Sequence, residues 1–279
     1  MSDIELEGTV NTRDVGGMPL ANGEGKVRDD VLIRSDNLQD LTPADVRRLV
    51  GDLHVKRVVD LRTGVELRGT GPGRLDGVPG VRVDHLSLFP EVGETTDAAA
   101  GGLDGPAGPD ILPWARQPGE KRHAEPEDDV RTWSTIGIAR VYLRYLVQRP
   151  DSIVAALRDI AEAAVDGGAT IVHCAAGKDR TGTVVALALD LIGVDRAAIE
   201  ADYLATVPNA AAILDRLVTT PTYHDDVADT SVADHAPRPG TMPAVLAGID
   251  EHFGGTAAFL ASAGWTDDDT ARLRRALIG

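Results

Sequence analysis

The stretch of this sequence best suited to chemistry runs from His173 to Gly182. It contains the only cysteine of the chain, Cys174, and an arginine six positions later, Arg180. Residues 175–179 begin with two alanines and a glycine, and such small side chains let a backbone curl closely around a ligand. A buried strand should precede this loop and a buried helix should follow it, so its amides would form an anion-binding concavity at a helix N-terminus.

The loop therefore predicts a cradle for a phosphoryl group. The guanidinium of Arg180 would close the ring, because its planar fork can hold two non-bridging phosphate oxygens. The amides and this guanidinium would neutralise the charge on the phosphate without a metal or another cofactor. The predicted phosphate-binding residues are Ala175, Ala176, Gly177, Lys178, Asp179 and Arg180.

Cys174 is the predicted nucleophile. The same amides and the helix dipole would stabilise its thiolate, and a sulfur anion beneath a phosphate is placed for in-line attack. This attack would give a phosphocysteine intermediate and expel an alcohol or a phenol. The hydroxyl of Thr181 would assist the sulfur when it leaves in the second step, and His173 would bond neighbouring backbone and fix the orientation of the cysteine.

A leaving alkoxide or phenolate needs a proton, so a carboxylic acid should reach it. Two candidates for this general acid are Asp179, within the loop, and Glu91, in an acidic stretch. Asp179 could instead stabilise the N-terminus of the following helix. Glu91 could instead be a solvent-exposed acid in an acidic loop, without a catalytic role. Lys178 would either contact a second phosphate or remain a solvated lysine.

Such a loop has three functional alternatives to a phosphatase. A nucleotide-binding Walker loop fails, because Asp179 stands where that loop needs Ser or Thr, and Val172 where it needs its first glycine. A sulfurtransferase also uses one cysteine in an anion-binding loop, but the spacing to Arg180 and the following Thr181 disfavour it. A module that binds phosphorylated ligands without turnover stays open.

The loop resembles the signature of the cysteine-dependent protein tyrosine phosphatases, which is His-Cys, five residues, then Arg-Thr-Gly. The run Gly177-Lys178-Asp179-Arg180 is similar to that of a bacterial branch of the family. Further segments recur in the same order as in this branch, so the resemblance extends over most of the chain. These segments are residues 11–17, 34–38, 60–74 and 201–204.

The resemblance implies a parallel four-stranded sheet flanked by helices and the hydrolysis of phosphotyrosine. In this branch it also implies activity toward phosphoserine, phosphothreonine and phosphoinositides, so the expected partner is a phosphorylated protein or small molecule. Members have a mobile helical lid, which here would lie at about residues 207–245. Glu91 falls where the related enzymes carry an aspartate, at the end of a strand.

The pattern of elements agrees with one α/β domain over residues 1–279. Short β-branched runs predict strands, and amphipathic or wholly apolar stretches predict helices. Strands that alternate with helices, followed by helices alone, indicate a parallel-type sheet with a helical C-terminal layer. The Gly-, Pro- and acid-rich residues 91–130 predict a mobile insertion. Strands are expected at 31–33, 57–61, 81–86 and 169–173, and helices at 42–51, 138–147, 151–164, 181–192, 195–204, 210–217, 242–252 and 266–278.

Composition narrows the class of protein further. The chain has 279 residues with 28 Lys plus Arg against 44 Asp plus Glu, a net charge of −16, which disfavours nucleic acids and anionic membranes as partners. One cysteine excludes an internal disulfide, and the acidic start does not resemble a signal peptide. The histidines lack the spacing of a metal site. We expect a cytoplasmic monomer without membrane insertion, with leaderless export left open.

Overall fold

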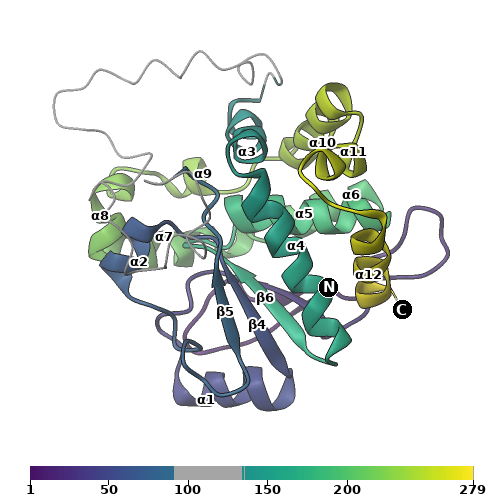
Figure 1. Cartoon of the computed structure of the whole chain (residues 1–279). Helices are drawn as coiled ribbons and strands as arrows, with labels where there is room; N and C mark the ends of the chain where they lie inside the picture. The colour runs from purple at the N-terminus through teal and green to yellow at the C-terminus, as the bar shows by residue number, and fades with distance from the viewer. Residues whose placement is uncertain (91–133, 135, 279) are drawn as a thin grey trace.

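A parallel sheet forms the centre of the molecule (Figure 1). The computed structural model describes residues 1–90, 134 and 136–278. Four parallel strands lie in the order β3 (Leu32–Ser35), β6 (Ala169–His173), β4 (Val55–Asp60) and β5 (Arg82–His85). The predicted four-stranded parallel sheet is therefore confirmed.

Two short strands extend this sheet beyond β3. They are β1 (Ser2–Asp3) and β2 (Arg13–Asp14), and both pair in the antiparallel direction. The sequence did not predict them, because a strand of two residues has no periodicity to recognise.

The central strand β6 separates two hydrophobic clusters. Its side chains alternate between the faces, so Val172 packs into the larger cluster with the helices and Ile171 into the smaller one. The smaller cluster lies beneath α1 (Pro43–Arg47), which is capped by Thr42 and continues as the π-helical turn Arg48–Asp52. Every residue of β6 is buried, including the polar Thr170 and His173, as expected for a strand that is covered on both faces.

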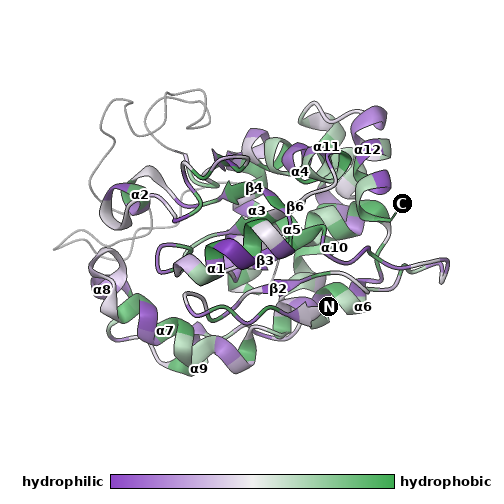
Figure 2. Ribbon diagram, turned by 90° about the horizontal axis from the view of Figure 1, so that it is seen from below, coloured by the Kyte–Doolittle hydropathy of each residue, from purple (hydrophilic) through white to green (hydrophobic). Residues whose placement is uncertain are grey.

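Helices cover the other face of the sheet. The helix α5 (Asp179–Ile192) is green over most of its length and lies in the middle of Figure 2. It is apolar on nearly every side because the sheet and other helices surround it. The surrounding helices are α3 (Gly137–Gln148), α4 (Pro150–Val165), α6 (Arg196–Leu204), α10 (Thr241–Phe253), α11 (Thr256–Ser262) and α12 (Asp267–Leu277).

A further group of helices lies on the side of the molecule away from α12 (Figure 1). It comprises α2 (Gly64–Thr70), the 3₁₀ turn Val207–Asn209, α7 (Ala210–Thr219), α8 (Pro221–Val227) and α9 (Val232–His235). The last four occupy the range expected for a lid, and α2, α8, α9 and α11 were not predicted. The expected insertion at 91–130 lies outside the described residues.

No helix in the described part of the chain combines the length and the apolar character that crossing a membrane requires.

We predict that the buried α5 stabilises the whole fold. Leu187 is 1% exposed in α5, so Leu187→Ala should lower the free energy of unfolding by about 2–5 kcal/mol through lost burial and a cavity. Val165→Ala is the control, because Val165 is 74% exposed. Urea denaturation measures both, and equal effects of the two substitutions would contradict the central position of α5.

Candidate active site

The loop singled out from the sequence joins the central strand to the buried helix. Cys174 directly follows β6, and Asp179 is the first residue of α5. The Cys174 residue is 1% exposed. The predicted strand–loop–helix arrangement is therefore present, and the loop opens at the carboxyl edge of the parallel strands, where ligands bind in open α/β sheets.

Carbonyl groups of the loop are held from outside by two side chains. Asn11 Nδ2 donates to the carbonyl oxygen of Ala176 at 3.0 Å, and Arg34 Nη2 donates to that of Gly177 at 2.7 Å. In a planar trans peptide the N–H points opposite to the C=O. The amides that follow these carbonyls, those of Gly177 and Lys178, therefore point toward the inside of the loop.

A third peptide of the loop has the same orientation. The backbone N–H of Asn37 donates to the carbonyl oxygen of Ala175 at 3.2 Å, which turns the amide of Ala176 inward. No described group accepts a hydrogen bond from the amides of Ala176, Gly177 or Lys178. Converging amides without protein acceptors form a concavity that suits an anion.

One buried carboxylate fixes the side chains that hold these carbonyls. Asp202 lies in α6 and accepts from Arg13 Nε at 2.8 Å and from Arg34 Nη1. Arg13 Nη1 in turn donates to Asn11 Oδ1 at 2.8 Å. Burial alone would raise the pKa of Asp202, but the two guanidinium groups hold it below its ordinary value.

Gly177 is required where the loop turns. Its φ is +65°, in the left-handed region, and an added Cβ would lie 2.5 Å from the carbonyl oxygen of Ser35. Both the conformation and the close approach exclude a larger residue. This agrees with the small residues expected for a backbone that curls around a ligand.

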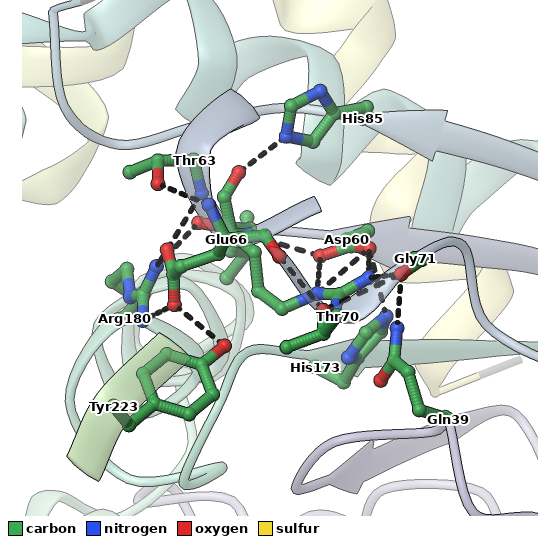
Figure 3. Close-up of polar contacts among 12 residues, drawn as sticks. Gln39, Asp60, Thr63, Glu66, Thr70, Gly71, His85, His173, Arg180 and Tyr223 are labelled. Atoms are coloured by element: carbon green, nitrogen blue, oxygen red, sulfur yellow. Dashed lines mark hydrogen bonds and ion pairs between the residues drawn. The ribbon is translucent and has the colours of Figure 1, made fainter. Parts of the chain in front are cut away.

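Arg180 is held by a carboxylate from another helix (Figure 3). Its Nη1 donates to Glu66 Oε2 at 2.6 Å and its Nη2 to Glu66 Oε1 at 2.8 Å. Glu66 belongs to the capping box of α2, where Oε2 also accepts from the backbone of Thr63 at 2.7 Å. Burial would raise the pKa of Glu66, but Arg180 lowers it, so the pair is ionised.

His173 faces a buried carboxylate and also interacts with the backbone of Cys174, the neighbour that the sequence suggested. Its Nε2 lies 3.5 Å from Asp60 Oδ2, and Asp60 also accepts from Arg62 Nε at 2.9 Å. Burial lowers the pKa of His173 to about 4, so the imidazole is neutral at pH 7. His173 therefore supports the end of β6 as a neutral side chain.

Asp179 is anchored at the start of α5. The hydroxyl of Tyr142 donates to Asp179 Oδ1, and Tyr142 lies 2.9 Å from the hydroxyl of Tyr203. Lys178 Nζ is 3.6 Å from Asp179 Oδ2. The Asp179 side chain is still 27% exposed, so it lies both at the loop and at the surface.

The remaining predicted residues differ in their surroundings. Thr181 is fully buried, and its hydroxyl has no hydrogen-bond partner among the described residues. Lys178 donates to the carbonyl oxygen of His235, in α9. Glu91 lies outside the described residues.

A cavity of about 250 Å³ lies beside Lys178. Its walls come from α3, from Tyr203 in α6 and from the segment around α9, so it combines apolar and charged side chains. The lining residues are Gly137, Ile138, Val141, Lys178, Tyr203, Asp234, Ala236 and Arg238.

Helices α7 and α8 cover part of the loop. Ala175 and Ala176 pack in one cluster with Ile213 and Leu217 from α7 and with Tyr223 from α8. This apolar contact explains why both alanines are buried although they belong to a loop.

Four residues that position the loop were not predicted to have this role. Asn11, Arg34, Glu66 and Asp202 lie in segments that resembled the phosphatase family, but the resemblance alone did not say what they contact. The Thr63-x-x-Glu66 capping box was a readable signal for α2. The pairing of Glu66 with Arg180 could not be predicted from such a signal, because the two residues are 114 positions apart.

Comparisons with known proteins identify the family. The model of the tyrosine phosphatase family matches residues 4–279. The chain is 30% identical to the triple specificity protein phosphatase PtpB of Mycobacterium tuberculosis. The alignment has 292 positions and covers the full length of both chains. It is 34% identical to a tyrosine-protein phosphatase of Nostoc commune over 124 residues, 40% of each chain. The protein belongs to the tyrosine phosphatase family and is a cysteine-based phosphatase.

Proposed function

We propose that the enzyme hydrolyses phosphomonoesters through a phosphocysteine intermediate, with Cys174 as nucleophile and Arg180 as phosphate clamp. The observation that carries this proposal is the set of inward-facing amides in the loop that follows Cys174. Glu66 supports the clamp, because it holds both terminal nitrogens of Arg180.

The reaction has two steps. The thiolate of Cys174 attacks phosphorus, an S–P bond forms, and the bond to the leaving oxygen breaks as that oxygen takes a proton. Water then attacks phosphorus, the S–P bond breaks, and the sulfur leaves as a thiolate with inorganic phosphate as the other product. The buried hydroxyl of Thr181 lacks a described partner and is available to assist this departure. The amides neutralise the charge of both transition states.

For the general acid we propose Asp179. Its carboxyl group is partly exposed at the start of α5, and Tyr142 fixes one of its oxygens. Stabilisation of the helix N-terminus is the alternative role for this residue. Glu91 remains the second candidate for the proton donor.

We propose phosphotyrosine in proteins as the main substrate, with dual specificity toward phosphoserine and phosphothreonine. The printed name of PtpB, a triple specificity phosphatase, supports this range. A phosphoinositide or another small phosphate ester is the second candidate, favoured by Lys178 and Arg238 at the neighbouring cavity. Both are cations that suit a second anionic group.

We further propose that residues 207–245 act as a lid over the loop. In support, α7 and α8 cover Ala175 and Ala176 through apolar side chains. We also propose a monomer in the cytoplasm, a reducing compartment that suits a nucleophilic cysteine. The net charge of −16 argues against nucleic acid as a partner.

Cys174→Ser should abolish turnover but preserve anion binding. We expect hydrolysis of an aryl phosphate in EDTA to fall by more than about a thousandfold, because the hydroxyl is a far weaker nucleophile than a thiolate. Inorganic phosphate should still bind, as measured by calorimetry. A serine variant as fast as the wild type would refute the mechanism, and phosphate binding without turnover in the wild type would favour a binding module.

Gly177→Ala should weaken phosphate binding by distorting the loop. The control is Gly23→Ala, because Gly23 has a similar φ of +73° but no described atom within 4 Å of the added Cβ. Both variants carry the left-handed strain of about 1–2 kcal/mol, and only Gly177→Ala adds the clash with Ser35. Calorimetric titration with phosphate should separate them, and equal affinities would show that the turn is not needed.

Asp179→Asn should slow turnover most for poor leaving groups. We expect kcat to fall about a hundredfold for a phosphotyrosine peptide, and much less for an aryl phosphate with an acidic phenol, because only the former needs a proton donor. Asp234→Asn removes the same charge beside the neighbouring cavity and serves as the control. A uniform loss for all leaving groups would instead assign Asp179 to the helix N-terminus.

A further inference from the structure

Tyr223 reaches the phosphate clamp from the lid segment. It lies in α8 and is 3% exposed, and its ring packs with Ala175 and Ala176 of the loop. Its hydroxyl donates to Glu66 Oε1 at 3.1 Å (Figure 3). The same side chain therefore contacts both the loop and the carboxylate that holds Arg180.

Tyr223 completes the hydrogen bonding of Glu66. Oε1 accepts from Arg180 Nη2 and from Tyr223, and Oε2 accepts from Arg180 Nη1 and from the backbone of Thr63. Each oxygen thus has one donor from the arginine and one from another element. The backbone of Thr63, at the beginning of α2, fixes Oε2 of Glu66. The second donor to Oε1 comes from α8.

The hydroxyl of Tyr223 remains a donor at physiological pH. Burial and the nearby carboxylate of Glu66 raise its pKa well above its ordinary value. A neutral hydroxyl beside a buried carboxylate forms a charge-assisted hydrogen bond, which is stronger than one between neutral groups. Its loss leaves a buried charged oxygen with one donor fewer.

Helix α8 lies against the helix that carries Glu66. A Cβ added to Gly69 of α2 would lie 2.2 Å from Thr222 Oγ1, so the two helices touch where Gly69 has no side chain. On the other side, α7 is attached through Arg216, which pairs with Asp36 and, at 3.0 Å, with Asp40. The hydroxyl of Tyr223 reaches Glu66 only while α8 lies against α2.

We propose that Tyr223 is a positioning residue, whose hydroxyl orients Glu66 and through it Arg180, so that the phosphate clamp is complete only when α8 is seated. The proposal rests on the proposed function of Arg180 and adds a link between the helices over the loop and the clamp beneath them. Tyr223 acts through Glu66 and does not itself touch the phosphate.

Tyr223→Phe tests this link, because it removes the hydroxyl and keeps the ring. We expect about tenfold weaker binding of inorganic phosphate and about tenfold lower kcat/KM on an aryl phosphate. Circular dichroism should show an unchanged fold. If the wild type binds phosphate and Tyr223→Phe binds it equally well, the proposed function stands and the link is wrong. If the wild type binds no phosphate, the proposed site itself fails.

A double-mutant cycle separates positioning from a merely looser lid. In a Glu66→Gln background, Tyr223→Phe should change phosphate affinity by less than about twofold, since its acceptor is altered. Arg216→Gln is the control, because it loosens α7 without touching Glu66 and should have the same effect in both backgrounds. An undiminished effect of Tyr223→Phe in the Glu66→Gln background would overturn the proposal, as would a coupling of Arg216 to Glu66 equal to that of Tyr223.

Discussion

The arrangement of the loop depends on the buried carboxylate of Asp202. Two guanidinium groups, those of Arg13 and Arg34, share this one anion in the interior. Without it, both would be buried cations with no ion-pair partner among the described residues, a state that costs several kcal/mol. Because Arg34 bonds the loop directly and Arg13 bonds Asn11, the same ion cluster determines where the loop carbonyls point.

Outward carbonyls leave a set of amides with no acceptor in the described protein. Unpaired buried amides are costly, so a chain rarely keeps them without a use. In this loop, hydrogen bonds to the carbonyls on the outside keep the amides in their inward orientation. An anion on the inside would satisfy these amides. The guanidinium of Arg180 is held in a similar way. Glu66 neutralises its charge and fixes its orientation in the absence of a ligand.

Local patterns were sufficient for the parts of the site that adjoin each other in sequence. The buried run of β6, the small residues after Cys174 and the apolar α5 predicted the strand, the loop and the helix, and the structure has all three. The capping signal at Thr63 predicts α2, and Ser231 with Asp234 similarly marks the start of α9. Neither helix was predicted, because glycines and prolines lie nearby and such residues are typical of loops.

The supports of the loop could not be predicted in this way. Asp202 and Arg13 are 189 positions apart, and nothing in the local sequence of either specifies the other as its partner. Such pairs follow from the order of strands and helices in space, which a periodic pattern does not determine. The same holds for Asn11, whose bond to Ala176 spans 165 positions.

The two sides of the loop are held by different forces, and this difference bears on how a substrate enters. The side toward the sheet is fixed by buried ion pairs and hydrogen bonds, which are directional and lose much of their energy on a small displacement. The side toward α7 and α8 is covered mainly by apolar contacts from Ile213 and Leu217, which have no preferred direction. This difference agrees with the proposed lid, because apolar contacts tolerate small displacements of these helices better than the directional bonds on the other side do. Directional contacts also cross this boundary, because Arg216 pairs with Asp36 and Asp40 and Lys178 donates to the carbonyl oxygen of His235. Among these contacts, the hydroxyl of Tyr223 is the one that reaches Glu66, so it is where the proposed link between helix position and the clamp lies.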